Sequence, residues 1–560
     1  MKNKSNKILK IVVSVLVLLF TKISLAQSIE IVSHSENPLE VSPLLGANLT
    51  INYIYTSEAG STGNHIYIGL EILDTNNNYQ STVADVTLNN QPVGNNTQQS
   101  VTFFIGSIHK LSNNLPAGHY YQTKAILYQS GGWTENAWAG HWNTPALVLQ
   151  DTNGYNFSSK TISKGADISW MTEMESKGYN WKDNEGNSKE LIPLLKEYDI
   201  DAVRLRVWVN PENSGANGWC DIDDLVAKAE KAKNNGLDIM LSIHYSDWWA
   251  DPGKQNKPNA WSNFSVSQLE TAVKNHTNDI LNALNTKGIT PKWIQIGNET
   301  NDGMLWTTGK ASTGGFANYA NFLNAGANAV KTFNNNIKTI LHLAKGNDNA
   351  LYRWNIDGLL NNGFQINNFD IIGMSLYPDE NNWKTYVDDT YNNMIDLTSR
   401  YNKEVMMVEI GFSYSRQDIT YQFITYMIEK TKQANGLGVF YWEPIARSPF
   451  TSYSKGAWDS DESPSIAMDA FLDKSTLSVE NIKKSSRIDF NVSPNPSISK
   501  IIINALENQV KIIKLYNIKG SLLIEKKGKK SSLEIDISKL TTGIYFININ
   551  NKVIKKIVKL

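Results

Sequence analysis

The stretch Trp293-Ile294-Gln295-Ile296-Gly297-Asn298-Glu299 decides the fold of this chain. It is a short apolar run that ends in an amide and a carboxylate, with Pro291 before it and Gly303 after it. Such a run, bounded by turn-forming residues, is typical of a strand that is buried on both faces, as in a parallel sheet. The sequence therefore predicts that Asn298 and Glu299 stand at the carboxyl end of a buried strand.

The same pattern returns once, in Val405-Met406-Met407-Val408-Glu409-Ile410-Gly411. A glutamate taken alone is most often a solvent-exposed residue or an ion-pair partner. Two glutamates that end two buried strands instead indicate a pair of carboxylates, Glu299 and Glu409, at one edge of a sheet.

From residue 160 to residue 473, buried strands alternate with amphipathic helices, and counting from Lys164 gives eight strands. Eight strand–helix units fit an α/β fold, the (β/α)8 TIM barrel, whose usual size is about 250 residues and whose insertions can take it past about 400. An open doubly wound sheet is the alternative, but no Gly-rich phosphate motif opens the first helix. We predict the barrel for residues 160–473.

In such a barrel all eight strand ends share one face. The strand Ala202–Val209 alternates and sends Arg204 and Arg206 to the same side, where they need anionic or carbonyl partners because an unpaired buried charge is costly. We therefore expect Glu409 to be held near Arg206 or His244. The side chains predicted to converge at the shared face are Trp208, His244, Asp247, Asn298, Glu299, Tyr377, Glu409 and Trp442.

The amino-acid composition limits the partners and the metal or disulfide chemistry that can be expected. The chain carries 53 basic and 54 acidic residues, so no net field favours nucleic acid or an anionic membrane. The single Cys220 excludes an intramolecular disulfide, and the 8 histidines show no zinc-ligand spacing. We expect no metal, no cofactor and no nucleic-acid partner, and we expect the protein to be a monomer.

The beginning of the chain differs from the barrel. Lysines followed by the apolar run Ile11–Phe20 predict a signal peptide over residues 1–26, and no later stretch is long and apolar enough to span a bilayer. Residues 28–155 hold short β-rich runs separated by turn residues, which predict a small all-β sandwich. We interpret the tryptophans of its last loop as packing that makes this domain a spacer, with a sugar-binding platform as the alternative. They are Trp133, Trp138 and Trp142.

A Lys-rich and Ser-rich linker over residues 474–489 leads to a second small all-β domain, predicted for residues 490–560. Its opening Ser493-Pro494-Asn495-Pro496, its turn at 516–520 and Gly543-Ile544-Tyr545 before a basic terminus resemble the C-terminal sorting domain of the type IX secretion system. The resemblance implies the type IX machinery as a partner and a location that is secreted or on the outer cell surface. An additional binding sandwich is the alternative.

Two carboxylates that flank a glycosidic bond can supply both the proton and the nucleophile for its hydrolysis. Asn298-Glu299 after the fourth strand and Glu409 after the seventh resemble the clan A glycoside hydrolases. More narrowly, the chain resembles family 53, the arabinogalactan endo-β-1,4-galactanases, in five motifs that occur in order. These are Gly165-Ala166-Asp167-Ile168-Ser169, residues 204–211, residues 244–252, residues 295–299 and Tyr441-Trp442-Glu443-Pro444.

The resemblance implies retaining endo-hydrolysis of β-1,4-galactosidic bonds in the (arabino)galactan side chains of pectin, with Glu299 as acid/base and Glu409 as nucleophile. The candidate substrate-binding residues are Asp167, Arg206, Trp208, His244, Asp247, Trp248, Trp249, Asn298, Tyr377 and Trp442. Two other functions stay open: another clan A endo-glycanase, such as a mannanase or xylanase, and a non-catalytic surface glycan-binding protein.

Some bacterial relatives hold a structural calcium in the loop after the seventh strand. Here that loop offers only Asp418, so we expect no such site. The acidic residues after the eighth strand, Asp459, Asp461 and Glu462, leave the question of calcium open.

Overall fold

The computed structural model describes residues 27–42, 44–57, 64–92, 94, 97–106, 112, 115–128, 135–139, 146–151, 157–213, 215–472, 490–493, 497–505, 510–517, 522–530, 532–549 and 553–559. The predicted signal peptide and the predicted linker lie outside these residues. The chain divides into two compact units, residues 1–472 and 473–560.

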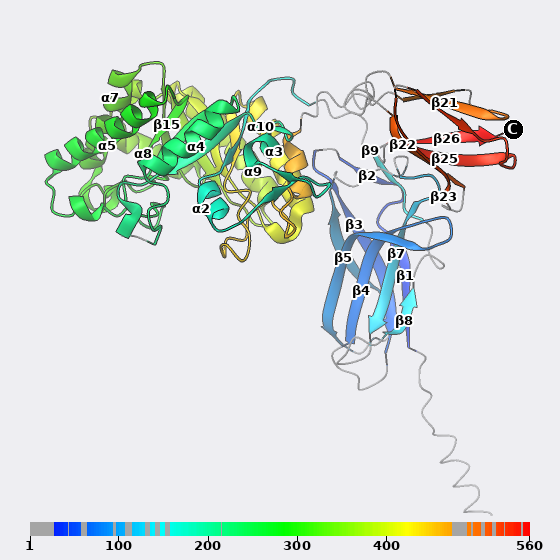
Figure 1. The fold of residues 1–560 in the computed structure, drawn as a ribbon. Helices are drawn as coiled ribbons and strands as arrows, with labels where there is room; N and C mark the ends of the chain where they lie inside the picture. Colours follow the sequence, from blue (N-terminus) through cyan, green and yellow to red (C-terminus); the bar gives the residue numbers. More distant parts are fainter. Residues whose placement is uncertain are drawn as a thin grey trace, which may run out of the picture. The chain divides into compact units, whose positions relative to one another are not determined.

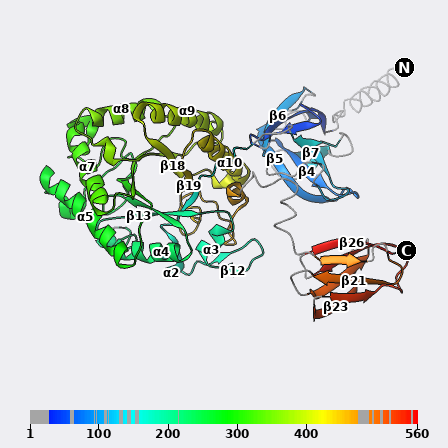
Figure 2. The same ribbon diagram turned by 90° about the horizontal axis from the view of Figure 1, so that it is seen from above.

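Eight parallel strands close into a barrel in the first unit, as predicted (Figure 2). The first and last strands close it, with Gly165 paired to Phe440. In barrel order the strands are β10 (Ser163–Asp167), β13 (Ala202–Val207), β14 (Asp238–Ile243), β15 (Trp293–Ile296), β16 (Lys338–Leu343), β17 (Ile371–Leu376), β18 (Glu404–Ile410) and β19 (Gly438–Tyr441).

Figure 2 shows the helices as a ring around the strands. They are α2 (Met171–Ser176), α3 (Leu191–Lys196), α4 (Ile222–Asn234), α5 (Val266–Thr286), α6 (Ala311–Gly314), α7 (Phe316–Phe333), α8 (Asn349–Leu360), α9 (Trp383–Tyr401) and α10 (Gln417–Gln433). The hairpin β11 (Trp181–Lys182) and β12 (Ser188–Lys189) precedes α3. Among the described residues no helix is long and apolar enough to cross a membrane.

Two helix starts can be compared with their sequence signals. Asp221 before the apolar run of residues 222–235 predicts an N-cap, and its side chain does accept from the backbone N–H of Asp224 at the start of α4. The pattern Ser267-Gln268-Leu269-Glu270 predicts a capping box that begins at Ser267, and this is wrong by two residues. Ser265 and Gln268 form the box, with both of its hydrogen bonds present, so Ser267 lies inside the first turn of α5.

Apolar side chains fill the barrel interior near the amino ends of the strands. They are Ala202, Met240, Trp293, Ile340, Ile371, Met406, Val408 and Phe440. Strand β10 contributes a glycine at this level, because a Cβ on Gly165 would lie 2.1 Å from the Phe440 ring. The packed layer leaves the carboxyl ends of the strands as the place for polar chemistry.

Two antiparallel sheets precede the barrel, with strand orders β1-β3-β6 and β5-β4-β7-β8 (Figure 1). Their bounds are β1 (Ser28–His34), β3 (Ala47–Thr56), β4 (Asn64–Leu73), β5 (Tyr79–Gln91), β6 (Gln99–Ile105), β7 (Tyr120–Tyr128) and β8 (Glu135–Ala139), and β2 (Leu39–Val41) pairs with β9 (Leu149–Asp151). Trp133 and Trp142 lie outside the described residues, and only the backbone of Trp138 is described. The spacer interpretation therefore stays a prediction.

The second unit also consists of two antiparallel sheets, with orders β20-β21-β24 and β23-β22-β25-β26. Its strands are β20 (Phe490–Ser493), β21 (Lys500–Ala505), β22 (Val510–Asn517), β23 (Leu522–Lys530), β24 (Ser532–Asp536), β25 (Gly543–Ile549) and β26 (Val553–Lys559). Alternate residues of facing strands, such as Ile501, Ile503, Leu515 and Ile547, form its core.

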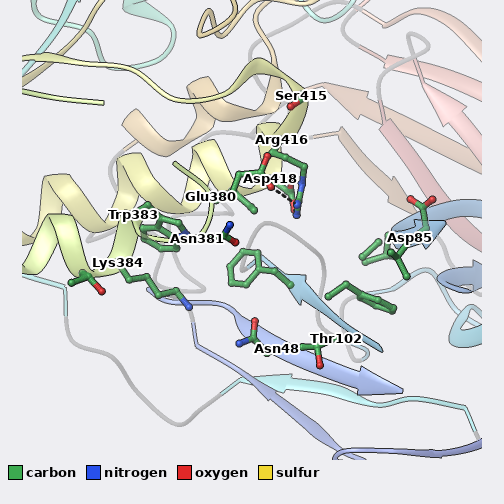
Figure 3. Close-up of a pocket in the computed structure, with 17 residues that line it drawn as sticks. Asn48, Asp85, Thr102, Glu380, Asn381, Trp383, Lys384, Ser415, Arg416 and Asp418 are labelled. Atoms are coloured by element: carbon green, nitrogen blue, oxygen red, sulfur yellow. Dashed lines mark hydrogen bonds and ion pairs between the residues drawn. The ribbon is translucent and has the colours of Figure 1, made fainter. Parts of the chain in front are cut away.

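A pocket of about 760 Å³ adjoins the loops that follow β17 and β18. Figure 3 shows Arg416 reaching toward the carboxylates of Glu380 and Asp418, with N–O distances of 3.1 and 3.0 Å. Neither Glu299 nor Glu409 lines this pocket, so it is separate from the predicted pair of carboxylates.

Candidate active site

The barrel brings the predicted polar side chains to the carboxyl ends of its strands. Asp167 ends β10, Glu409 is the last residue but one of β18, and Asn298 and Glu299 follow β15 after Gly297. The backbone of Glu299 is in the left-handed region, with φ of 47°. A non-glycine residue held in this conformation is strained, and such strain is concentrated at functional sites.

Arg204 is the centre of the hydrogen-bonding network. Its side chain is 1% exposed. Its guanidinium contacts Asp167 Oδ2 at 2.6 Å, Asn298 Oδ1 at 2.7 Å, Gln295 Oε1 at 2.9 Å, Ser242 Oγ at 3.0 Å and Glu409 Oε2 at 3.0 Å. The last contact is an ion pair that lacks hydrogen-bond alignment. One buried cation is therefore shared by two carboxylates, Asp167 and Glu409, and Glu409 is the predicted nucleophile.

We expected Glu409 to be held near Arg206 or His244, but the ion pair is made by Arg204, and Arg206 acts on Glu409 only through its charge. The reason is the register of the barrel. Arg204 is paired with Asp167 between β10 and β13, whereas Arg206 lies two residues further along β13 and ion-pairs with Glu443.

Glu299 and Glu409 form the predicted pair. Their side chains are largely buried, and a carboxylate oxygen of each lies within 4.8 Å of one of the other. The Tyr377 hydroxyl donates to Glu409 Oε1 at 2.7 Å. Glu409 therefore has a cation and a hydroxyl donor beside it, which favour its charged form.

The carboxyl groups of Glu299 and Glu409 have different surroundings, and these shift their pKa values to different extents. Burial, together with the charge of Glu409, raises the pKa of Glu299 to about 8. Burial also raises the pKa of Glu409, but Arg204 and the Tyr377 hydroxyl oppose that shift. Glu299 is therefore the group that keeps its proton near neutral pH, and Glu409 is the group that ionises first.

A wall of aromatic rings lies beside this pair. The half-buried indoles of Trp170, Trp249 and Trp442 contact one another edge to face, with ring centroids 5.3 to 5.9 Å apart. Tyr453 packs on Trp442 at 4.7 Å. Partly exposed aromatic faces of this kind suit stacking against sugar rings.

The ion pair of Arg206 and Glu443 supports the wall from behind. Arg206 Nη1 lies 2.5 Å from Glu443 Oε1, and its guanidinium carbon lies 4.5 Å from the ring centroid of Trp249 and 5.0 Å from that of Trp170. The backbone N–H of Trp170 also donates to Glu443, at 3.1 Å. Burial raises the pKa of Glu443, but two donors pointing at its oxygens indicate the carboxylate.

Several predicted substrate ligands have another role in the structure. Asp167, Arg206 and Trp208 are 0 to 1% exposed and contact other side chains of the site, so a direct contact of these three with substrate stays a prediction. Asp247 accepts the backbone N–H groups of Asn210 and Asn259 and thereby ties two loops together.

The remaining predicted ligands lie at the site. Trp248 and Trp249 are half-buried, and Trp248 packs on Trp208 at 4.9 Å. His244 Nδ1 accepts from Trp208 Nε1 at 3.3 Å, and burial lowers the pKa of His244 well below its usual value, so the ring is neutral. Asn298 is fixed from both sides, because Nδ2 donates to the Ala250 carbonyl while Oδ1 accepts from Arg204.

Sequence reasoning assigned no role in the site to five residues: Trp170, Tyr453, Glu443, His342 and Ser375. Trp170 carries a usable signal, because it follows the end of the first strand just as Trp442 follows the last. Glu443 carries no such signal, because it meets Trp170 only when the last strand pairs with the first and closes the barrel. His342 and Ser375 stand inside strands and carry no positional signal.

One group of buried acidic and histidine side chains among the described residues has metal-ligand spacing, and it is Glu299, His342 and Glu409 itself. In the loop after β19, Glu462 pairs with Lys182 at 3.1 Å and Arg447 at 3.3 Å, and Asp461 accepts from Ser463. Glu462 and Asp461, two of the three acidic residues considered as calcium ligands, thus have partners within the protein.

Comparison with known proteins follows the same division of the chain. Residues 163–425 match the family model of glycosyl hydrolase family 53, and residues 491–560 match that of the secretion system C-terminal sorting domain. A probable arabinogalactan endo-beta-1,4-galactanase A of Neosartorya fischeri is 32% identical over 311 residues, which are 51% of this chain and 85% of the relative. The arabinogalactan endo-beta-1,4-galactanase of Cellvibrio japonicus is 31% identical over 328 residues, 53% of this chain and 84% of the relative.

Two solved structures are also similar to the barrel part of this chain. A structure from a study of two fungal beta-1,4-galactanases superposes with a TM-score of 0.51 at 28% identity, covering 56% of this chain and 99% of that one. The GH53 catalytic domain of Ignisphaera aggregans gives the same TM-score at 29% identity and covers 57% of this chain and 98% of its own.

The Arg206–Glu443 pair gives a test of the packing behind the site. Replacing Glu443 with Gln leaves the buried guanidinium without its charge partner, which should lower the free energy of unfolding by about 3–5 kcal/mol. Glu462→Gln is the matched control, because it removes a carboxylate from a partly exposed ion pair and should cost no more than about 1 kcal/mol. Urea denaturation of the two variants measures the free energy of unfolding of each. Equal free energies of unfolding would contradict the supporting role of the Arg206–Glu443 pair.

Proposed function

Since this chain belongs to glycosyl hydrolase family 53 and is a glycoside hydrolase, we propose that it cuts β-1,4-galactosidic bonds inside (arabino)galactan chains with retention at the anomeric carbon. The observation that carries the proposal is the unequal pair of buried carboxylates. Glu409 has Arg204 and Tyr377 beside it, whereas no cation among the described residues pairs with Glu299.

In the first step Glu409 attacks the anomeric carbon while Glu299 gives its proton to the departing glycosidic oxygen. The result is a glycosyl-enzyme ester on Glu409 and a shortened galactan chain that leaves with the proton. Arg204 and Tyr377 keep Glu409 ionised before the attack. They also lower the energy of the carboxylate that returns when the ester is broken.

In the second step the Glu299 carboxylate takes a proton from water as the water oxygen attacks the anomeric carbon. The ester bond to Glu409 breaks, the free sugar end forms, and Glu299 is again protonated. The close approach of the two carboxyls supports this route over inversion. Retaining enzymes hold their carboxyls about 5–5.5 Å apart, whereas inverting ones leave about 6.5–9.5 Å for a water molecule.

Product analysis tests the substrate. Incubation with linear β-1,4-galactan should release galacto-oligosaccharides of several lengths from the start, as an endo-acting enzyme does, with far slower release from mannan and xylan. The relatives' names support galactan. Faster hydrolysis of mannan or xylan would overturn the proposal, and binding of galactan with no hydrolysis of any of the three would favour a non-catalytic glycan-binding protein.

Replacing each carboxylate should give a different defect. Glu409→Gln should lower kcat on the order of 10⁴-fold or more on every substrate, because the nucleophile is lost. Glu299→Gln should lower activity on galactan by about 10²- to 10⁴-fold. Formation of the ester from an aryl galactoside with a good leaving group should survive in this variant, because that departure needs little protonation.

Glu404→Gln is the control, since Glu404 is exposed at the other end of β18. It should leave both rates unchanged. Equal loss on galactan and on the aryl galactoside in Glu299→Gln would contradict its role as the acid.

The pH dependence should follow from the two carboxyls. Activity requires Glu299 protonated, so kcat/KM should fall as the pH rises through the Glu299 pKa, which is raised to about 8. Activity also requires Glu409 ionised, so it should fall again on the acid side, and both limbs belong to the coupled pair. Persistence of the alkaline limb in Glu299→Gln would show that another group causes it.

We further propose that residues 490–560 direct export through the type IX machinery to the medium or the outer surface, with the catalytic barrel as a monomeric cargo. The match to a secretion sorting domain supports this. Deleting residues 490–560 should keep the protein inside the native host while leaving its specific activity on galactan unchanged. Unimpaired export of the deletion variant would refute the assignment.

A further inference from the structure

Two fully buried residues stand behind Glu299. His342 lies in β16 and Ser375 in the neighbouring strand β17, and both are 0% exposed. His342 Nε2 and Ser375 Oγ are 2.6 Å apart, and a carboxylate oxygen of Glu299 lies within 4.8 Å of a ring nitrogen of His342. The Ser375 hydroxyl acts on the Glu299 carboxyl as a side-chain hydrogen-bond donor and lowers its pKa. The three side chains therefore form one chain of hydrogen bonds that ends on the predicted acid.

The direction of this chain can be deduced from a backbone group. The backbone N–H of Glu299 donates to His342 Nδ1 at 3.3 Å. A backbone N–H can only donate, so Nδ1 carries no hydrogen. Burial, aided by the charge of Arg204, lowers the pKa of His342 well below its usual value, so the ring is neutral and its one hydrogen is on Nε2.

His342 Nε2–H must then donate to Ser375 Oγ. The Ser375 oxygen is occupied as an acceptor on that side, and its own hydrogen is free to turn to the Glu299 carboxyl. The backbone N–H of Glu299 thus determines the tautomer of His342, and this tautomer determines the orientation of the Ser375 hydroxyl. The hydroxyl in turn donates to the side chain of the same glutamate.

We propose that His342 and Ser375 are positioning residues that decide which oxygen of Glu299 carries the transferable proton. A hydroxyl that donates to one carboxyl oxygen makes that oxygen an acceptor, so the acid hydrogen resides on the other oxygen, which is free to face the glycosidic bond. After the proton has been given away, the same hydroxyl stabilises the carboxylate until water restores it. The inference rests on the proposed acid role of Glu299 and extends it to two residues that do not touch substrate.

The test compares Ser375→Ala, which deletes the donor, with Ser375→Thr, which keeps a hydroxyl. Ser375→Ala should lower kcat/KM on galactan by about tenfold to a hundredfold, the usual worth of a hydrogen bond to a charged group. On an aryl galactoside with a good leaving group the loss should be much smaller. The alkaline limb of kcat/KM should move to higher pH, because removing a donor to the carboxylate favours the protonated form, and Ser375→Thr should restore both properties toward the parent.

Thr390→Val is the matched control. Thr390 is a buried residue of α9 whose hydroxyl donates to the Tyr386 carbonyl at 2.7 Å, and among the described residues it has no hydrogen bond to the network around Glu299. It should change neither the substrate ratio nor the pH profile. If Ser375→Ala does not fold, Ser375→Cys replaces the donor with a weak one at similar volume and is read in the same two assays.

The outcomes separate the two proposals. Equal losses on both substrates with an unmoved alkaline limb would mean that Ser375 only packs the barrel, and would overturn the inference. If the parent enzyme does not cut galactan, the proposed substrate fails. The pH profile on the aryl galactoside then still reports whether Ser375 acts on Glu299.

Discussion

Arg204 is a buried cation that contacts two carboxylates and two side-chain amides at once, and its position makes two neighbouring glutamates unequal. A guanidinium removed from water at this depth is tolerable only when its donors are matched by acceptors. Asp167 forms an ion pair with it from inside the barrel, at 2.6 Å. Its second ion pair is then available to Glu409, the carboxyl that must be ionised, while Glu299 keeps a high proton affinity.

The closed parallel sheet is what allows this arrangement. Its strands place Asp167, Arg204 and Glu409 at one end, and a packed apolar layer fills the other. Side chains can approach closely there because the backbone is already hydrogen-bonded within the sheet. Around this centre the residues divide into half-buried aromatic residues that we propose to face substrate, such as Trp442 and Trp249, and buried residues packed behind them, such as Glu443.

The sequence predicted the barrel, the positions of Glu299 and Glu409 and two residues of the aromatic wall, Trp249 and Trp442, because those follow from strand ends that can be read along the chain. It did not predict which arginine meets Glu409, since alternation gives the side of a strand but not the register between strands. It also passed over His342 and Ser375. Both look like ordinary strand residues until two neighbouring strands bring them against Glu299.

The central claim is that Arg204 makes Glu409 the nucleophile and leaves Glu299 as the acid. The most direct measurement is to react the enzyme with a 2-deoxy-2-fluoro galactosyl donor that has a good leaving group, and to locate the trapped sugar by peptide mass spectrometry. The fluorine slows hydrolysis of the ester so that it accumulates. We predict the label on Glu409, and a label on Glu299 or on any other residue would contradict this assignment.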